Sequence, residues 1–270
     1  MNKSSVEQYR ENGYALVPGL FSREEAETYS DHYMALRAAG SYPGDLSGAD
    51  LESDDPLKQY PRLIHMHRWD KISFEWMIDP RMNQCLTTLL GKEPYAGQTM
   101  LYFKPPKSRG QALHQDQFYL NVLPGTCIAA WMALDVSNEE TGCLQVIPKT
   151  GDLPVLCTEK ANTKESFTEV TVPLAKGMKP NPVIMNPGDV FFFNGSVIHG
   201  SFPNRSSDRF RRALIGHYIT GDAEKVFSFY HPVIRMDGTE VEFESSDKGS
   251  SCGVWVDEDG KPVVEMSNQN

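Results

Sequence analysis

Hydrophobic and polar positions divide the chain into a helical first part and a strand-rich remainder. Residues 13–19, Gly-Tyr-Ala-Leu-Val-Pro-Gly, are typical of a short strand. Ser22 stands three residues before Glu25, which is a capping-box pattern, and Phe21 is placed to support the turn. Apolar positions then recur at steps of three and four along one face of the predicted helix, at Ala26, Tyr29, Tyr33 and Leu36.

A second helix is predicted between Asp79-Pro80, a cap followed by proline, and Gly91. The segment before it, residues 39–58, combines glycine, serine and proline with several acidic residues. That composition favours a solvated loop, which is either a plain acidic surface loop or a lid over a binding site.

From about residue 94 the pattern changes to short apolar or alternating runs separated by turn residues, which predicts strands. The runs are 98–104, 127–134, 143–147, 183–185, 190–194, 212–219 and 226–230. Helices followed by many short strands favour a mainly β fold, a double-stranded β-helix (jelly roll) with the helices packed outside. We expect a single domain over 1–270, with a helical part at about 1–92, a jelly-roll core at about 93–235 and a C-terminal extension at about 236–270.

The composition limits the classes of molecule that the protein is expected to bind. A net charge of -10 and a pI near 5.2 disfavour binding to nucleic acid or to an anionic membrane, so a small-molecule partner is expected. The polar N-terminus lacks a signal sequence, which predicts a cytoplasmic protein. The five cysteines are widely spaced and form no CxxC pair, so they are predicted to be reduced, mostly buried thiols without a disulfide.

Three residues form a candidate metal site. His114 and Asp116 lie two residues apart, and in an extended segment both side chains project from the same face. His199 supplies a third ligand after the apolar run 190–193 and is followed by Gly200, which permits a close backbone approach. Two histidines and one carboxylate suit non-haem Fe(II) and leave adjacent coordination positions open, whereas a structural zinc site needs a fourth ligand.

An arginine beyond His199 suggests a cosubstrate. In an antiparallel hairpin, Arg211 would return towards the metal and bind the far carboxylate of 2-oxoglutarate through two parallel hydrogen bonds. Position alone does not separate Arg211 from Arg205, Arg209 and Arg212, any of which is equally explained as a surface charge beside a turn.

These residues belong to a longer ordered set of motifs. It comprises residues 11–19, Thr99-Met-Leu-Tyr-Phe-Lys-Pro-Pro106, His114-Gln-Asp116, Ala130-Trp131, Gly142-Cys-Leu144 with Pro148, Pro187-Gly-Asp189, His199-Gly-Ser201, Asn204 and Phe210-Arg-Arg-Ala213. In these motifs the chain resembles the phytanoyl-CoA dioxygenase family of Fe(II)/2-oxoglutarate-dependent oxygenases. The resemblance implies iron ligands His114, Asp116 and His199 and selects Arg211 for the 2-oxoglutarate carboxylate. It also implies cosubstrate neighbours at Gln98, Met100, Lys104, Trp131 and Ser201.

The implied activity is that of a dioxygenase, typically a hydroxylase, that oxidises a C–H bond of a small molecule while O2 converts 2-oxoglutarate to succinate and CO2. Related halogenases lack the ligand carboxylate, so Asp116 favours oxidation without halide. Residues near the metal motif are candidates for the substrate pocket: Tyr102, Phe118, Tyr119 and Asn121. The family often continues Gly-Ser-His where this chain has Lys149-Thr-Gly-Asp152, which leaves the substrate open. The acidic composition slightly favours a small polar or cationic metabolite.

Two other functions fit the same motifs. A cupin-like metal enzyme that uses no 2-oxoglutarate would share the barrel and ligands but need no carboxylate-binding arginine, and a non-catalytic jelly-roll module would only bind the metal. His65 and His67 form a second closely spaced pair without a carboxylate, and are expected to be core or pocket-wall histidines. His217 alternates in phase with Arg211 and either faces the barrel interior or is a core histidine.

Overall fold

Both faces of the central sheet are buried, which explains why its strands read as continuous apolar runs. The computed structural model describes residues 3–40, 48–246 and 251–268. In β5 (Cys127–Ala133), Ile128, Ala130 and Met132 pack towards the helices, whereas alternate residues such as Trp131 pack on the opposite face. β10 (Val190–Asn194) and β12 (Ala213–Thr220) divide their side chains between the same two clusters.

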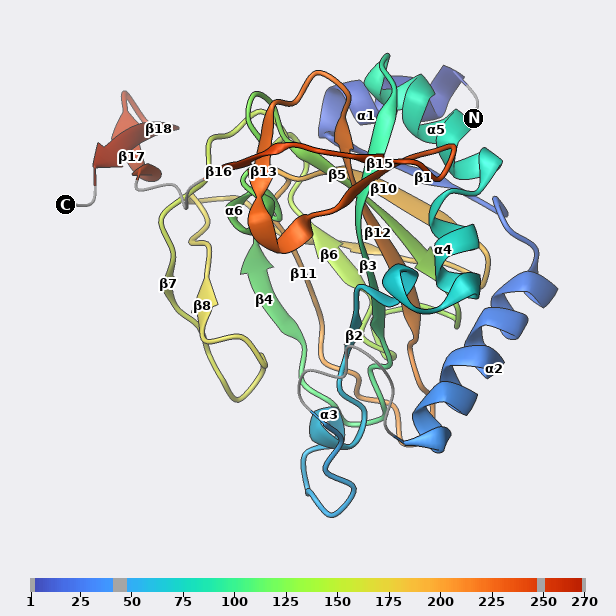
Figure 1. Ribbon diagram of the computed structural model, residues 1–270. Helices are drawn as coiled ribbons and strands as arrows, with labels where there is room; N and C mark the ends of the chain where they lie inside the picture. The colour runs from blue at the N-terminus through green and yellow to red at the C-terminus, as the bar shows by residue number, and fades with distance from the viewer. Residues whose placement is uncertain (1–2, 41–47, 247–250, 269–270) are drawn as a thin grey trace.

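Two antiparallel sheets form a jelly roll, as the sequence predicts (Figure 1). The large sheet has the order β1 (Tyr14–Val17), β10, β5, β12, β3 (Pro94–Tyr102), β14 (Val233–Arg235) and β15 (Glu240–Val241), with β2 (Leu63–Ile64) also paired to β3. The small sheet has the order β4 (Gln111–His114), β11 (His199–Ser201), β6 (Leu144–Val146) and β9 (Asn181–Val183). Side chains from both sheets, among them Trp131 and Val146, meet in one buried cluster, so the two sheets share an inner core.

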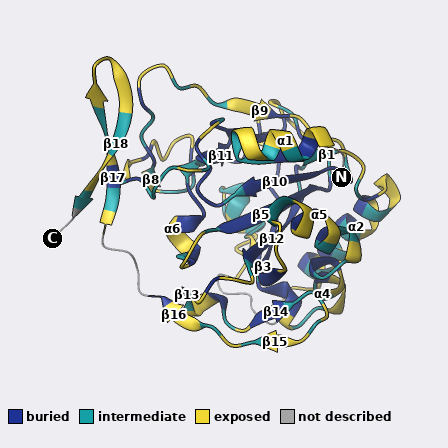
Figure 2. Cartoon of the chain, turned by 90° about the horizontal axis from the view of Figure 1, so that it is seen from above, coloured by how far each residue is buried: buried dark blue, intermediate teal, exposed yellow. Residues whose placement is uncertain are grey.

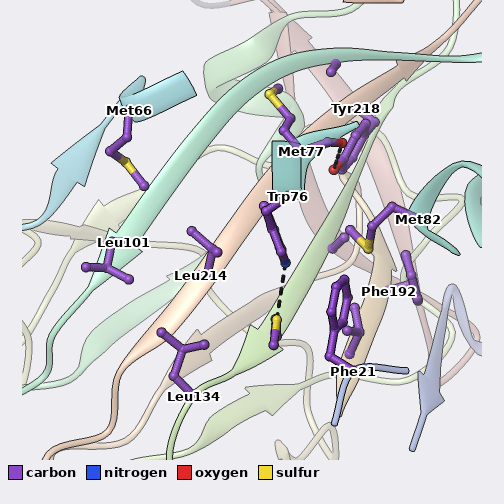
Figure 3. Packing of buried hydrophobic residues seen from close by; sticks show 14 of the residues in the cluster. Phe21, Met66, Trp76, Met77, Met82, Leu101, Leu134, Phe192, Leu214 and Tyr218 are labelled. Carbon is purple, nitrogen blue, oxygen red and sulfur yellow. Dashed lines mark hydrogen bonds between the residues drawn. The ribbon is translucent and has the colours of Figure 1, made fainter. Parts of the chain in front are cut away.

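Helices cover the outer face of the large sheet (Figure 1). α2 (Arg23–Ala39) begins with the predicted capping box, and its predicted apolar face packs into the outer core. α5 (Pro80–Leu90) has the predicted start and stop. α4 (Lys71–Met77) buries Trp76 completely and places its Nε1 3.2 Å from Met132 Sδ, while the Tyr218 hydroxyl donates to the Met77 carbonyl at 2.8 Å (Figure 3).

Several short elements differ from the sequence predictions. α1 (Lys3–Asn12), α3 (Pro56–Gln59), α4 and α6 (Gln117–Leu120) were not expected, because one to three turns carry too little periodicity to separate from loops. The predicted strand 226–230 divides into β13 (Lys225–Phe227) and a 3-10 turn, η2 (Ser228–Tyr230). The run 183–185 contributes only the end of β9. Residues 48–58 of the acidic segment include the start of α3, and residues 41–47 lie outside the described chain.

The C-terminal part ends in a hairpin, β17 (Ser251–Glu258) and β18 (Lys261–Asn268), which stands at one side of the body (Figure 2). Remaining short pairs join β7 (Glu159–Lys160) to β8 (Val170–Thr171) and β13 to β16 (Glu244–Ser246). Within the described chain, no helix is both long and apolar enough to cross a bilayer.

The prediction that all five cysteines are free thiols is wrong. Cys157 and Cys252 form a disulfide. Hydrogen bonds from Gly253 N to Val155 O (2.8 Å) and from Cys157 N to Gly253 O (2.9 Å) align the hairpin with the loop that carries Cys157. A separation of 95 residues left no spacing signal for this pair. The other three cysteines are buried and free, as expected: Cys85, Cys127 and Cys143.

Candidate functional site

His114 and His199 face each other across two neighbouring strands. They are directly paired in the register of β4 and β11, and their ring centroids are 4.1 Å apart. Gly200 allows the strands to approach this closely, since a Cβ atom there would lie 2.7 Å from the Gln111 carbonyl oxygen. The expectation of a close backbone approach after His199 is confirmed.

Backbone carbonyls fix the orientation of both imidazoles. His114 Nδ1 donates to Ala112 O at 2.9 Å, and His199 Nδ1 donates to Val197 O at 3.0 Å. A neutral ring that donates from Nδ1 keeps an unprotonated Nε2. The side-chain amide of Gln111 faces His114 Nε2 at 3.2 Å, which fits a nitrogen that accepts. Both Nε2 lone pairs are therefore available to one ion, as is usual for histidines that bind metals.

Asp116 completes the group, although by a route that differs from the prediction. The segment 114–116 is not extended, because Asp116 adopts helical backbone angles (φ -64°, ψ -30°) and precedes α6. Its carboxylate makes no capping bond to that helix. Oδ1 instead lies 3.6 Å from the Nε2 atoms of His114 and His199. In the described chain, these three residues are the only cluster of potential metal ligands, with ligand atoms within 4.8 Å of one another.

His217 holds the other carboxylate oxygen. Its Nε2 donates to Asp116 Oδ2 at 3.1 Å, so the alternative that this histidine faces the barrel interior is correct. Burial opposes ionisation of Asp116, but the nearby imidazoles of His199 and His217 hold the pKa of this carboxyl well below its usual value. Burial and the neighbouring His114 lower the pKa of His199 to about 4. At neutral pH His199 is thus a neutral imidazole and Asp116 an ionised carboxylate, which suits a divalent cation.

Arg211 reaches the cavity from the large sheet, not through a hairpin with β11. The predicted hairpin is wrong, because β11 lies in the small sheet and β12 in the large one. Arg211 extends the pairing of β3 with β12, since its backbone N–H donates to Lys104 O at 3.1 Å. The guanidinium is buried, lies 5.0 Å above the Trp131 ring and donates from Nε to Gly142 O, while Nη1 has no hydrogen-bond partner within the described residues.

The three competing arginines are all paired with carboxylates. Arg205 contacts Glu165 at 3.6 Å, Arg209 contacts Glu140, and Arg212 contacts Asp135 at 2.7 Å. Arg205 and Arg209 are also largely exposed. Arg211 is consequently the member of the four whose charge is left for a ligand.

A second buried basic side chain, Lys104, lies beside Arg211. Lys104 Nζ donates to Ser201 Oγ at 2.9 Å. Burial, together with the positive charge of Arg211, lowers the pKa of Lys104 well below its usual value. No described carboxylate lies within 4.0 Å of either side chain. Because buried charges in proteins are normally paired, a buried guanidinium and an adjacent amine without a carboxylate partner indicate a site for an anionic ligand.

All of the predicted site residues border one cavity of about 2020 Å³. They are the three candidate metal ligands with Gln98, Met100, Tyr102, Lys104, Phe118, Tyr119, Asn121, Trp131, Ser201 and Arg211. Sequence reasoning missed Arg62 and Tyr230, which also line it. Neither stands in a motif, and only the pairing of β2 with β3 could have placed Arg62 here.

His65 and His67 do not join the metal group. Both are buried, and His67 Nδ1 lies 2.9 Å from Thr99 Oγ1. Burial lowers the pKa of each imidazole to about 3. They are buried histidines that do not line the cavity, so of the two alternatives the sequence left open, core histidines are correct.

Comparison with known proteins agrees with this geometry. The chain matches the family described as Phytanoyl-CoA dioxygenase (PhyH) over residues 9–213. It is 25% identical over 241 residues to the peroxisomal phytanoyl-CoA dioxygenase of Rattus norvegicus, covering 83% of this chain and 71% of that protein. It is 26% identical over 226 residues to a 2-aminoethylphosphonate dioxygenase from an uncultured bacterium, covering 83% and 84% of the two chains.

Solved structures share the fold. The α-ketoglutarate-dependent epimerase SnoN from nogalamycin biosynthesis superposes with a TM-score of 0.64 and 22% identity, covering 82% of this chain and 84% of the other. EctD from S. alaskensis, with 2-oxoglutarate and 5-hydroxyectoine, superposes with a TM-score of 0.65 and 20% identity, covering 82% and 76%.

Proposed function

The chain belongs to the phytanoyl-CoA dioxygenase family, and from this premise we propose that it is an Fe(II)- and 2-oxoglutarate-dependent dioxygenase that hydroxylates or otherwise oxidises a C–H bond of a small molecule. In this proposal His114, Asp116 and His199 bind iron. The observation that carries it is the convergence of two Nε2 lone pairs and one carboxylate oxygen beside a buried arginine that has no carboxylate partner.

Bound iron would supply the chemistry of dioxygen activation, coupled to decarboxylation of 2-oxoglutarate to succinate and CO2. Residues around the proposed iron ligands set their tautomer and orientation. Ala112 O and Val197 O keep both imidazoles in the Nδ1–H tautomer. His217 donates to Asp116 Oδ2 and so leaves Oδ1 directed towards the two histidines.

The carboxylate end of the cosubstrate has a separate set of partners. Arg211 offers the planar fork that matches a carboxylate, and Trp131 lies against its face. Lys104 Nζ, which donates to Ser201 Oγ, has further N–H donors for the same carboxylate. Apolar side chains on the inner face, among them Met100 and Ile215, limit water around these groups.

Arg211 also separates the proposal from its first alternative. A metal enzyme without 2-oxoglutarate would have the same three ligands, but the buried Arg211 guanidinium and the adjacent Lys104 amine would then have no anion to bind. A non-catalytic module would need none of the solvent-connected cavity that surrounds the ligands.

Anaerobic titration with Fe(II) and 2-oxoglutarate, followed by oxygen exposure and measurement of succinate, tests the function. We expect Asp116→Ala to abolish iron binding and succinate formation. Arg211→Gln should retain iron binding but weaken 2-oxoglutarate binding by about 30-fold or more, because a buried charged hydrogen-bonded pair is broken. Arg209→Gln, an exposed change two residues away, is the matched control.

Unchanged 2-oxoglutarate affinity in the Arg211→Gln variant would favour the enzyme without a keto acid. Succinate formation at the wild-type rate in the Asp116→Ala variant would refute the ligand assignment itself.

A further inference from the structure

Arg62 projects into the cavity from the end of a short edge strand. In the pairing of β2 with β3, Leu63 lies opposite Leu101 and Ile64 opposite Met100, which places Arg62 beside Tyr102. The contact exists, since Arg62 Nη1 donates to the Tyr102 hydroxyl at 3.3 Å. Arg62, Ile64, Met100 and Tyr102 all line the cavity.

The charge of Arg62 has no carboxylate partner among the described residues, whereas neighbouring basic residues on the cavity wall do. Arg109 contacts Asp55 at 2.6 Å, and Lys225 contacts Glu244 at 2.9 Å. A guanidinium has five N–H donors, and the hydrogen bond to Tyr102 uses one of them.

Three tyrosines line the same cavity as this guanidinium. Tyr102 on β3, Tyr119 on α6 and Tyr230 in η2 each lie near enough to raise the pKa of Arg62, with Tyr102 the largest cause. The side chain therefore stays charged. Although Arg62 is exposed to solvent, its guanidinium has an aromatic hydrogen-bond partner and forms part of the cavity lining.

Large apolar side chains are exposed at the same cavity. The exposed fractions are 52% for Phe118, 45% for Leu123, 43% for Phe229 and 55% for Met266. Exposed apolar groups that gather around one opening, unlike scattered ones, mark a surface that receives an apolar ligand. The cavity thus has Arg62, which lacks a carboxylate partner among the described residues, in the same lining as these apolar side chains.

We propose that the substrate is amphipathic, with an oxyanion group (a carboxylate, phosphonate or phosphate) bound by Arg62 and a hydrocarbon part against Phe118, Leu123 and Phe229. This inference rests on the proposed function for the cavity. It assigns the two arginines different ligands: Arg211 with Lys104 binds the cosubstrate, and Arg62 binds the substrate. It departs from the polar or cationic metabolite that the acidic composition favoured, because the lining of the cavity differs from the average surface.

Three probes of matched shape test the assignment: hexanoate, pentylphosphonate and hexanamide. Their binding is measured by calorimetry on the protein before loading and after anaerobic loading with Fe(II) and 2-oxoglutarate. We expect wild-type protein to bind at least one acid about tenfold more tightly than the amide, since a charge-assisted pair replaces a neutral one. Comparison of the two acids shows which oxyanion fits.

Three variants test whether Arg62 causes the tighter binding of the acids. Arg62→Gln should bind acid and amide equally, Arg62→Lys should retain part of the preference, and Arg23→Gln, a surface change on α2, should leave it unchanged. All three variants should keep wild-type affinity for 2-oxoglutarate.

The proposal is wrong if no acid binds, if wild-type protein binds acid and amide equally, or if Arg62→Gln keeps the preference. It is also wrong if Arg62→Gln weakens 2-oxoglutarate binding, because Arg62 would then belong to the cosubstrate site. Failure of wild-type protein to bind 2-oxoglutarate in the presence of Fe(II) would instead contradict the proposed function, while an acid preference that depends on Arg62 could persist.

Discussion

Gly142 shapes the end of the cavity where Arg211 and Lys104 meet. Its φ of +82° is in the left-handed region. A Cβ atom would lie 2.5 Å from Lys104 Cε and 2.6 Å from Phe202 O. The Gly142 carbonyl also accepts the hydrogen bond from Arg211 Nε. One residue without a side chain therefore contacts both buried basic side chains.

We expect Gly142→Ala to lower the free energy of unfolding by about 2 kcal/mol or more, from the backbone conformation and the overpacking together. It should also weaken 2-oxoglutarate binding, because Lys104 and the Gly142 carbonyl must both shift. Urea unfolding and anaerobic titration measure the two effects.

Gly177→Ala is the matched control for this change. Gly177 has a similar φ of +90°, but no atom lies within 4 Å of its Cβ position. The control should lose only about 1 kcal/mol and keep its ligand affinity. Equal effects of the two substitutions would show that Gly142 has no steric role.

At the residue scale, sequence motifs identified the groups that converge but not how they do so. His114, Asp116 and His199 were predicted together, yet Asp116 arrives through a helical turn and not through an extended strand. His217 and Arg62 carry no motif of their own. Their roles depend on strand pairing between distant segments, which periodicity alone does not specify.

At the element scale, the hairpin β17–β18 is attached to the body at two segments, residues 155–157 and Pro173. The Cys157–Cys252 disulfide and the backbone pairing of Gly253 form this attachment, and Trp255 Nε1 donates to Pro173 O at 2.9 Å. The two strands of the hairpin pair mainly with each other. Its position therefore depends on a small number of contacts.

Thiol counting tests this attachment. In denaturant without reductant, an alkylating reagent should modify Cys85, Cys127 and Cys143 only, and after reduction it should modify every cysteine. In native protein these three thiols should react slowly because they are buried. Intact-mass spectrometry reads all three states, and modification of every cysteine in unreduced denatured protein would contradict the disulfide.

Elements with strong local signals were predictable. α2 and α5 have capping residues and an apolar face, and β10 is a compact apolar run between turns. α4 was missed because its seven residues are stabilised by Trp76 in the core and not by their own periodicity. The disulfide was missed because the pairing of Gly253 with residues 155 and 157 is a tertiary contact.

For the whole molecule, two buried neutral histidines predict a loss of stability in acid. The folded-state pKa of His65 and of His67 is about 3, below the ordinary value of 6.5, because burial disfavours the charged form. A depressed folded-state pKa means that the unfolded chain binds the proton more readily. The associated stability is complete above about pH 6.5 and declines as the pH falls towards 3.

Each histidine should contribute about 1.4 kcal/mol per pH unit to this decline. In urea unfolding between pH 7 and pH 5, His67→Gln should show a shallower pH dependence than wild type, and His65→Asn with His67→Gln a shallower one still. Met66→Leu changes a buried neighbour without an ionisable group and should keep the wild-type slope. An unaltered slope in the double variant would contradict the buried neutral state.

The site is built from both layers of the sandwich. His114 and His199 lie on the small sheet. Trp131 and His217 lie on the large sheet, and Arg211 comes just before β12 of that sheet. A ligand that contacts residues of both sheets would add links between them to the side-chain packing and hydrogen bonds that already join them. Ligand binding would then also stabilise the fold: at a free ligand concentration of about 1,000 times Kd, the free energy of unfolding rises by roughly 4 kcal/mol. Cells that supply the ligand in excess would thereby also preserve the protein against thermal opening and proteolysis.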